Sequence, residues 1–462
     1  MENTENERTG EEQSFFHRLF RSVAVAGRGM LDPKLRAANA RRSKVAKLTD
    51  LCRALLSEEA EPSAAALALD ALALYRELDD AGCTEFFEVL ATGFEPALDT
   101  VMQAIDAYRA DPTARNLSRL SQVAEAPRQE LFRRLNTAPG GTAALVELRE
   151  RLLRLLTARR HLRPIDEDLN HLFRSWFNRG FLTLRRISWQ TPALILEKLI
   201  RYEAVHAIDG WDDLRRRLAN DRRCFAFFHP SLPDEPLIFV EIALVRGLSD
   251  KVQPLLDRSG EPSDPARADT AIFYSISDCQ GGLRGISFGN FLIKQVAAEL
   301  GAENPRVRTF ATLSPIPGFR RWIEENTAFV ATVASGQAII AWAERTKPPV
   351  PRKDAVPPEA LREPLSNLCA HYLVNAKRKD GMPADAVARF HLRNGARLER
   401  VNWVADVSAR GLAQSGGLMV NYQYRLDEVE RNHEAFVRGG KVIASSKVER
   451  QARHCVRPAP VA

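Results

Sequence analysis

The sequence lacks any long uninterrupted apolar run, and this absence excludes a membrane-spanning helix. No stretch of the 462 residues approaches the roughly 18 consecutive apolar residues that such a helix requires. The N-terminus is polar and acidic, without the apolar segment that is typical of a secretory signal. Gly and Pro number 25 and 26, close to average usage, which excludes a collagen-like or low-complexity chain.

Metal-ligand spacing is also missing from the sequence. No two of the six cysteines form a C-x-x-C pair, and the nine histidines include no H-E-x-x-H arrangement. We therefore predict that the protein binds no metal and that its cysteines are buried free thiols in a reducing cytoplasm. The cysteines are Cys52, Cys83, Cys224, Cys279, Cys369 and Cys455.

The charge of the chain is only mildly positive. The 66 basic and 59 acidic residues give a net charge of +7 and an isoelectric point near 9.2. The basic residues are spread along the chain, whereas a nucleic-acid-binding protein usually concentrates them on one element, so we predict no nucleic-acid partner. A pocket for a polyanionic small molecule, such as a nucleotide or coenzyme A, would need only a few of these cations.

The chain from about residue 45 to residue 180 has the apolar spacing of helices. Leu145, Leu148, Leu152 and Leu156 recur at intervals of three and four residues, which places them on one face of a helix. Runs of β-branched residues are rare here, so the pattern predicts an all-α bundle. No catalytic motif stands out in this bundle, and we expect it to serve packing or oligomerisation.

The pattern changes near Trp189, and short apolar runs then alternate with helical segments. This alternation predicts a mixed α/β domain with a central sheet. We place the helical domain, with a disordered start, at residues 1–185 and the sheet domain at residues 186–462. The runs interpreted as strands are CFAFF (224–228), LIFVEIALV (237–245), AIFYSIS (271–277), RTFATLS (308–314), LERVNWVAD (398–406) and LMVNYQYRL (418–426).

A glycine-rich segment, residues 279–294, follows one of these strands and precedes a helical pattern. Such an arrangement binds phosphates, because glycines let the backbone approach an anion and the N–H groups of the helix start face it. The segment partly fits the R/Q-x-x-G-x-G/A turn with which GNAT acyltransferases bind the pyrophosphate of coenzyme A. Arg284, Ser287 and Gly289 occupy those places. A β–α connection without a ligand is the alternative.

Ser314 and His391 are candidates for chemistry on positional grounds. Ser314 ends the strand-like run RTFATL and precedes Pro315, which restricts its backbone at the edge of the sheet where ligands bind. A structural turn is the alternative. His391 precedes Asn394-Gly395, a dipeptide typical of hairpins, so we expect it just before a turn. Spacing alone does not select His391 from the other eight histidines.

Several segments together resemble malonyl-CoA decarboxylase. They run in the order of that family from about Ile187 to the C-terminus, and the helical region before them suits its N-terminal bundle. The segments are HPSLPDEPLIFVEIAL (229–244), AIFYSIS followed by GLRGISFGNFLIK, ATLSPIPGFRRW (311–322), ARFHLRNGA (388–396) and NWVADVSARGLAQSGGLMVNYQY (402–424).

The resemblance implies both a fold and an activity. The fold is an all-α N-terminal helical bundle used in oligomerisation, followed by a GNAT-like mixed-sheet catalytic domain. The activity converts malonyl-CoA to acetyl-CoA and CO2 without a dissociable cofactor. The resemblance further implies a homotetramer or dimer. The C-terminus lacks the peroxisomal signal of animal members, so we expect a bacterial-type cytoplasmic enzyme.

The resemblance also implies site residues. It places the catalytic serine at Ser314, the catalytic histidine at His391, and Tyr424 near the acyl group. Some family members carry a carboxylate at the position of Ser287, so contacts of that side chain are not carried over. The malonyl-CoA-binding loop corresponds to Arg284, Gly285, Ile286, Ser287, Phe288, Gly289 and Asn290.

The implied reaction is chemically consistent with the missing metal motifs. A malonyl thioester contains its own electron sink, because loss of CO2 pushes electrons into the thioester carbonyl and gives an enolate. The enzyme must stabilise this enolate and protonate its α-carbon. A histidine, with an ordinary pKa of ~6.5, suits the protonation, so we expect His391 to be the general acid. Ser314 would either orient the malonyl carboxylate or relay the proton.

Three other functions remain open at this point. An acyl-CoA-dependent acyltransferase would use the same coenzyme loop, but it would consume acetyl-CoA only with an acceptor and would release no CO2. A scaffold built on the helical domain would bind its partner without any residue after about 185. Nucleic-acid binding rests only on the charge of +7, and it predicts an affinity that falls steeply with salt.

Overall fold

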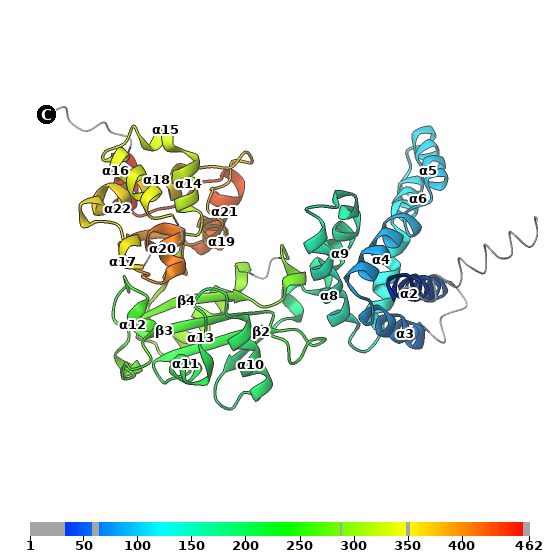
Figure 1. The fold of residues 1–462 in the computed structure, drawn as a ribbon, viewed down its shortest axis with the longest axis horizontal. Coiled ribbons are helices and arrows are strands. Elements are labelled where there is room, and N and C mark those ends of the chain that lie inside the picture. The colour runs from blue at the N-terminus through cyan, green and yellow to red at the C-terminus, as the bar shows by residue number, and fades with distance from the viewer. Residues whose placement is uncertain (1–32, 58–63, 287–288, 348–351, 456–462) are drawn as a thin grey trace, which may run out of the picture. The chain divides into compact units, whose positions relative to one another are not determined.

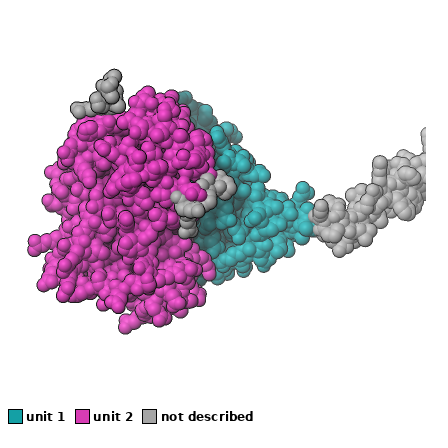
Figure 2. All heavy atoms as spheres, turned by 60° about the vertical axis from the view of Figure 1, so that its left-hand side comes forward, with its two compact units in different colours: residues 1–176, 281–285 teal, residues 177–280, 286–462 magenta. Residues whose placement is uncertain are grey.

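The computed structural model describes residues 33–57, 64–286, 289–347 and 352–455. The chain divides into two compact units, which Figure 2 distinguishes by colour. The first comprises residues 1–176 with residues 281–285, and the second comprises residues 177–280 with residues 286–462. The predicted disordered start lies outside the described residues, and the predicted boundary after residue 185 stays a prediction.

The first unit is helical throughout its described elements, as the sequence predicts. The face predicted from leucine spacing is buried, because Leu145, Leu148 and Leu152 are at most 2% exposed. Leu156 follows the end of that helix and is half-buried. The helices are α2 (Pro33–Leu56), α3 (Ala64–Arg76), α4 (Asp80–Gly93), α5 (Leu98–Ala110), α6 (Ala114–Ala124), α7 (Pro127–Thr137), α8 (Gly141–Leu155) and α9 (Arg163–Trp176).

Helices α5 and α6 pack against each other and bury very little (Figure 1). Helix α5 buries only Ala104, and α6 buries none of its residues. Three of their large apolar side chains face solvent: Leu98 is 71% exposed, Met102 47% and Leu117 51%. We call these two helices the α5–α6 hairpin.

The second unit is built on an eight-stranded mixed sheet with the order β1-β2-β3-β4-β5-β8-β6, in which β7 also pairs with β8. The pairing is antiparallel except between β4 and β5, which run parallel. The strands are β1 (Thr183–Ile187), β2 (Arg222–Phe228), β3 (Ile238–Val245), β4 (Thr270–Asp278), β5 (Thr309–Thr312), β6 (Ser314–Pro315), β7 (Arg397–Asn402) and β8 (Met419–Tyr424).

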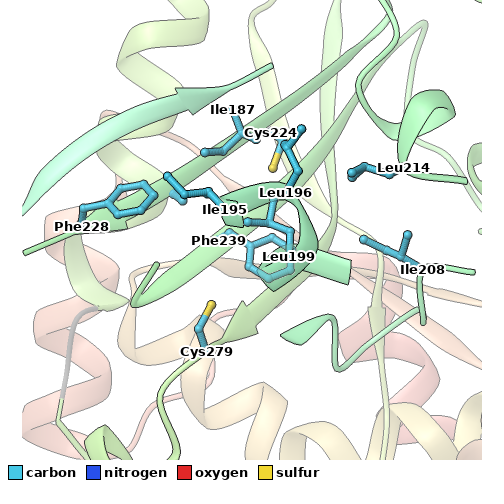
Figure 3. Close-up of a cluster of buried hydrophobic side chains, with 11 residues drawn as sticks. Ile187, Ile195, Leu196, Leu199, Ile208, Leu214, Cys224, Phe228, Phe239 and Cys279 are labelled. Carbon is cyan, nitrogen blue, oxygen red and sulfur yellow. The ribbon is translucent and has the colours of Figure 1, made fainter. Parts of the chain in front are cut away.

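Helices cover both faces of this sheet, as the nearly continuous apolar runs of β2 and β3 require (Figure 1). Figure 3 shows the buried cluster beneath α10 and α11, in which Ile195, Leu199 and Leu214 pack on Cys224 and Phe239. The helices are α10 (Ala193–Tyr202), α11 (Gly210–Arg217), α12 (Gln253–Leu256), α13 (Gly289–Glu303), α14 (Phe319–Glu325), α15 (Thr327–Val330), α16 (Gly336–Arg345), α17 (Arg352–Ala355), α18 (Arg362–Asn375), α19 (Ala386–Arg393), α20 (Ala409–Ser415), α21 (Val429–Gly439) and α22 (Ser446–His454).

Strands β4 and β5 separate part-way along the sheet. β4 remains paired with β3 from Thr270 to Asp278, but its pairing with β5 ends at Phe273 and Thr312. The Leu313 N–H still donates to the Phe273 carbonyl oxygen at 3.0 Å, and within the described residues no strand pairs with this edge of β4 from Tyr274 onward. The predicted architecture, a helical bundle followed by a mixed-sheet domain, is confirmed.

Candidate active site

The structure brings Ser314 and His391 together from segments that are 77 residues apart. Ser314 begins β6, one residue beyond the end of β5 and before Pro315, and it is 6% exposed. His391 lies on α19 and is 3% exposed. The Ser314 Oγ and the His391 Nε2 are 3.0 Å apart, which is hydrogen-bond distance.

The interpretation of Asn394-Gly395 as a hairpin turn is wrong. His391 lies inside a helix, and these two residues end that helix instead. Asn394 is its C-cap, and Gly395 has a φ of 79°, the left-handed conformation that glycine adopts at helix ends. Only Gly395 has a positive φ here, since the φ of Asn394 is −84°. The dipeptide therefore marks a chain reversal without specifying strands.

A chain of hydrogen bonds assigns the protons of this pair. The Ser314 hydroxyl donates to the Thr312 hydroxyl at 2.8 Å, so its oxygen is left to accept from the Nε2–H of His391. The other ring nitrogen, Nδ1, lies 2.8 Å from the Tyr424 hydroxyl and therefore accepts from it. Thr312 in turn accepts the backbone N–H of Tyr422 at 3.2 Å. These bonds hold His391 in one tautomer.

Burial makes His391 a neutral imidazole. Desolvation lowers its pKa from 6.5 to about 3, and the ring stacks on Tyr422 with centroids 4.5 Å apart. Burial also holds the pKa of the Tyr424 hydroxyl well above its ordinary value, so Tyr424 keeps its proton. At neutral pH the free protein thus holds an uncharged hydrogen-bonded chain from Thr312 to Tyr424.

A pocket of about 240 Å³ lies beside these hydrogen-bonded side chains, and Ser314 and His391 are part of its lining. Five lining residues lie between Phe273 and Asp278 of β4, and four lie on α19. Neighbouring strand residues point to opposite faces, so a pocket lined by consecutive ones follows the backbone edge. This edge is the one from which β5 has separated. Tyr424 is not among the described residues that line the pocket.

The glycine loop is described only in part. Ser287 and Phe288 lie outside the described residues, and Gly289 and Asn290 begin α13 without a description of their side chains. Ile286 is 7% exposed, and Arg284 is exposed. Arg284 and Gly285 belong to the helical unit and are not part of the pocket.

The first part of this loop has its backbone fixed within the helical unit. Gly282 lies so close to α8 that a Cβ there would be 1.9 Å from the Val146 carbonyl oxygen, so no other residue fits. The Arg149 guanidinium donates to the carbonyl oxygens of Gly282, at 2.6 Å, and Arg284, at 3.0 Å. The carboxylate of Asp166 accepts from the same guanidinium at 2.7 Å.

No resident metal site is evident in the described ranges. Among the residues 33–57, 64–286, 289–347 and 352–455, no three His, Cys, Asp or Glu side chains gather as metal ligands would. The predicted lack of a metal and of a cofactor stays a prediction. None of the helices in these same ranges is long and apolar enough to span a membrane.

Comparison with known proteins identifies the family. Residues 94–177 match the malonyl-CoA decarboxylase N-terminal domain, and residues 180–460 match the malonyl-CoA decarboxylase C-terminal domain. The chain belongs to the malonyl-CoA decarboxylase family. The family resemblance predicted from the sequence is therefore confirmed, and the protein is an enzyme of this family.

Relatives of this malonyl-CoA decarboxylase family member cover most of its length. The mitochondrial malonyl-CoA decarboxylase of Anser anser anser is 39% identical over 342 residues, 69% of this chain and 68% of the relative. The crystal structure of malonyl-CoA decarboxylase from Rhodopseudomonas palustris is 48% identical, with a TM-score of 0.78. That from Agrobacterium vitis is 46% identical, with a TM-score of 0.82. Each structure match covers 88% of this chain and 99% of the solved chain.

Sequence reasoning missed several residues around the Ser314–His391 pair of this family member. Thr312 and Tyr422 each lie two positions before a predicted residue on a strand, and that period of two places them on the same face. The period was therefore the signal for both. Asp385 directly precedes α19 as its N-cap, a role that its sequence would indicate only once the helix was recognised.

Proposed function

We propose that this enzyme converts malonyl-CoA to acetyl-CoA and CO2. Membership of the malonyl-CoA decarboxylase family supports the proposal, and one observation carries it further. The Ser314–His391 hydrogen bond of 3.0 Å lies in a pocket that follows the open edge of β4. This arrangement suits a reaction that needs a proton donor beside an extended thioester.

The pocket lining favours loss of CO2. Phe273, Ile276, Val387 and Phe390 surround the space with apolar side chains. An anionic carboxylate gains little solvation there, whereas departing CO2 is neutral and needs none. The electrons of the broken C–C bond pass into the thioester carbonyl and give the enolate. The open backbone N–H groups of β4 beyond Phe273 would donate to its oxygen.

The proton balance assigns a role to His391. Malonyl-CoA carries a carboxylate that acetyl-CoA lacks, so each turnover consumes one proton from solvent. The free enzyme holds His391 neutral, but a bound carboxylate beside the ring raises the imidazole pKa by charge attraction. Binding of the anionic substrate would thus draw a proton from solvent onto His391. After CO2 leaves, that proton moves to the α-carbon and the imidazole is again neutral.

Ser314 has two possible functions in this scheme. Its oxygen accepts from Nε2 of His391, so it would carry the imidazole proton to the α-carbon as a relay. Alternatively, its hydroxyl would turn from Thr312 to the malonyl carboxylate and orient it. Tyr424 donates to Nδ1, so we assign it to the orientation of the imidazole. We propose that no dissociable cofactor takes part.

The coenzyme moiety is assigned to the glycine loop. Gly285 has a φ of 83° and, among the described residues other than its chain neighbours, no heavy atom lies within 4 Å of where its Cβ would be, so the backbone there can be approached closely. The exposed Arg284 would supply a cation for phosphate. The residues assigned to malonyl-CoA binding are Arg284, Gly285, Ile286, Ser287, Phe288, Gly289 and Asn290.

One experiment tests the activity. Purified protein is incubated with malonyl-CoA and EDTA, without any acyl acceptor, and CO2 and acetyl-CoA are measured together. We expect both products in equal amounts. If folded protein binds coenzyme A but releases neither product, the decarboxylase proposal fails. Consumption of acetyl-CoA only after an amine is added would instead identify an acyltransferase.

We further propose that the enzyme self-associates through its helical unit, as a dimer or homotetramer. The support is the α5–α6 hairpin, with Leu98, Met102 and Leu117 exposed although each is apolar. Sedimentation of the purified chain tests this directly, and a monomer at micromolar concentration would contradict it.

We also propose a cytoplasmic location. The six cysteines are all free and buried, as suits a reducing compartment. The relatives from Anser anser anser and Rattus norvegicus are named as mitochondrial proteins. Fractionation of cells that express this protein therefore decides between the two locations.

A further inference from the structure

Asp385 is a buried carboxylate that the proposed mechanism does not use. It is 1% exposed and forms the N-cap of α19, where its side chain accepts the N–H of Ala388 at 2.9 Å. The backbone N–H of Val387 also faces this carboxylate. Helix α19 carries His391 and three more residues of the pocket lining. One side of the carboxylate therefore fixes the start of the helix that presents His391.

The same carboxylate also faces the turn that follows Ser314. The backbone N–H of Gly318 points at it, and the Tyr372 hydroxyl donates to its Oδ2 at 3.4 Å. Gly318 ends the short turn that follows β6 and is the N-cap position of α14. A Cβ at Gly318 would lie 2.5 Å from the Tyr372 hydroxyl, so glycine is needed for this close approach. Asp385 thus receives donors from both segments of the Ser314–His391 pair.

We propose that Asp385 is a positioning residue that holds His391 against Ser314. The inference rests on the proposed decarboxylase function. A helix cap alone does not explain the residue, because Ser or Asn caps a helix as well and costs less to bury. Only an acceptor-only side chain with two oxygens serves the N–H groups of α19 and of Gly318 together. Its carboxylate joins two segments that carry the two reacting side chains.

The decisive variant is Asp385→Asn. The amide oxygen of Asn still accepts the N–H of Ala388, so the cap survives, but the amide NH2 cannot accept from Gly318. We expect kcat for malonyl-CoA to fall about 10- to 100-fold, because small displacements of paired catalytic groups cost this much. We expect the Kd for acetyl-CoA, measured by calorimetry, to change less than about threefold, because α19 still lines the pocket.

Two further variants separate positioning from stability. The Ser445 hydroxyl caps α22 by accepting the backbone N–H of Val448, and Ser445→Ala removes this cap. The variant should lower Tm and leave kcat at the wild-type value. Tyr372→Phe keeps the buried ring and removes only the donor to Asp385, so it should fold even if Asp385→Asn does not. We expect it to lower kcat about two- to fivefold, as the loss of one hydrogen bond would.

The outcomes distinguish a failure of the positioning role of Asp385 from a failure of the proposed decarboxylase function. If the wild-type chain releases no CO2 from malonyl-CoA, the proposed function fails. If it does, and Asp385→Asn and Tyr372→Phe both keep the wild-type kcat, the positioning role is overturned. A rise in the Kd for acetyl-CoA with kcat unchanged overturns it as well, since that result assigns Asp385 to the pocket wall alone.

Discussion

The α5–α6 hairpin and the pocket beside β4 depart from the usual distribution of side chains in opposite directions. In the hairpin, Leu98 and Leu117 are apolar and more than half exposed. In the pocket, Ser314 and His391 are polar and almost fully buried. Exposed apolar side chains are typical of a surface that another molecule covers, whereas a strongly lowered pKa in a pocket, as for His391, is typical of a reacting centre. The two departures therefore mark the hairpin as the proposed surface for self-association and the pocket as the proposed site of the reaction.

The largest loss of activity is expected when His391 of the buried Ser314–His391 pair is replaced. His391→Asn removes the proposed proton donor, so kcat should fall about 10²- to 10⁴-fold, the usual worth of general acid catalysis. The Kd for acetyl-CoA should stay near the wild-type value, because that ligand needs no proton. Product release by the variant is measured together with acetyl-CoA binding. A wild-type kcat would end the assignment of His391.

Ser314→Ala should have the next largest effect and should also choose between the two serine roles. We expect kcat to fall about 100-fold, as when a single preorganised donor is lost. A relay role predicts an unchanged Kd for malonyl-CoA. An orienting role predicts weaker binding of malonyl-CoA but not of acetyl-CoA, which lacks the carboxylate. Full activity would remove Ser314 from the mechanism.

Acid should destabilise the fold because the buried His391 resists protonation. The unfolded chain protonates His391 near its ordinary pKa of 6.5, whereas the folded chain resists protonation until about 3. The residue therefore stabilises the fold above pH 6.5, and this contribution falls by about 1.4 kcal/mol for each pH unit between 6.5 and 3. In urea unfolding between pH 7 and pH 4.5, His391→Asn should lose less stability than the wild type. Parallel stability curves would contradict the burial argument.

The smallest effect on stability is expected in the hairpin. Leu117→Ser should change the unfolding free energy by less than about 0.5 kcal/mol, because the side chain is already half in water. It should nevertheless weaken self-association, as measured by sedimentation. Leu145→Ala is the matched control, because Leu145 is fully buried and its truncation should cost about 2–5 kcal/mol. Equal losses of stability from both variants would contradict the exposed setting of Leu117.

Much of the fold could be predicted because its signals are local. The leucine face of α8 and the apolar runs of β2 and β3 are burial patterns that neighbouring residues specify. The setting of His391 could not be predicted in this way, because Asn394-Gly395 ends a helix and a hairpin strand equally well. Ser314 and His391 meet through pairing of β6 with β8 and packing of α19, which no local pattern encodes.

The site residues were named from family resemblance rather than from physics. Composition and spacing did not distinguish a catalytic Ser314 from a serine in a structural turn, and they did not select His391 among the nine histidines. Asp385 shows why, since the donors to its carboxylate come from α19, from Gly318 and from Tyr372. Such a convergence of distant segments is visible in coordinates and not in residue order.

The bond network of Arg149 has a consequence for how this chain can be divided. The family's two domains meet between residues 177 and 180, which invites expression of the later part from a shortened gene. A chain that starts at residue 180 would contain Gly282 and Arg284 but not the guanidinium that both carbonyl oxygens accept from. The shortened polypeptide would keep every proposed reacting side chain and still lose the hydrogen bonds that support the loop proposed to bind the coenzyme. The C-terminal part of the chain therefore depends on a side chain of the N-terminal part, although the two match separate family domains.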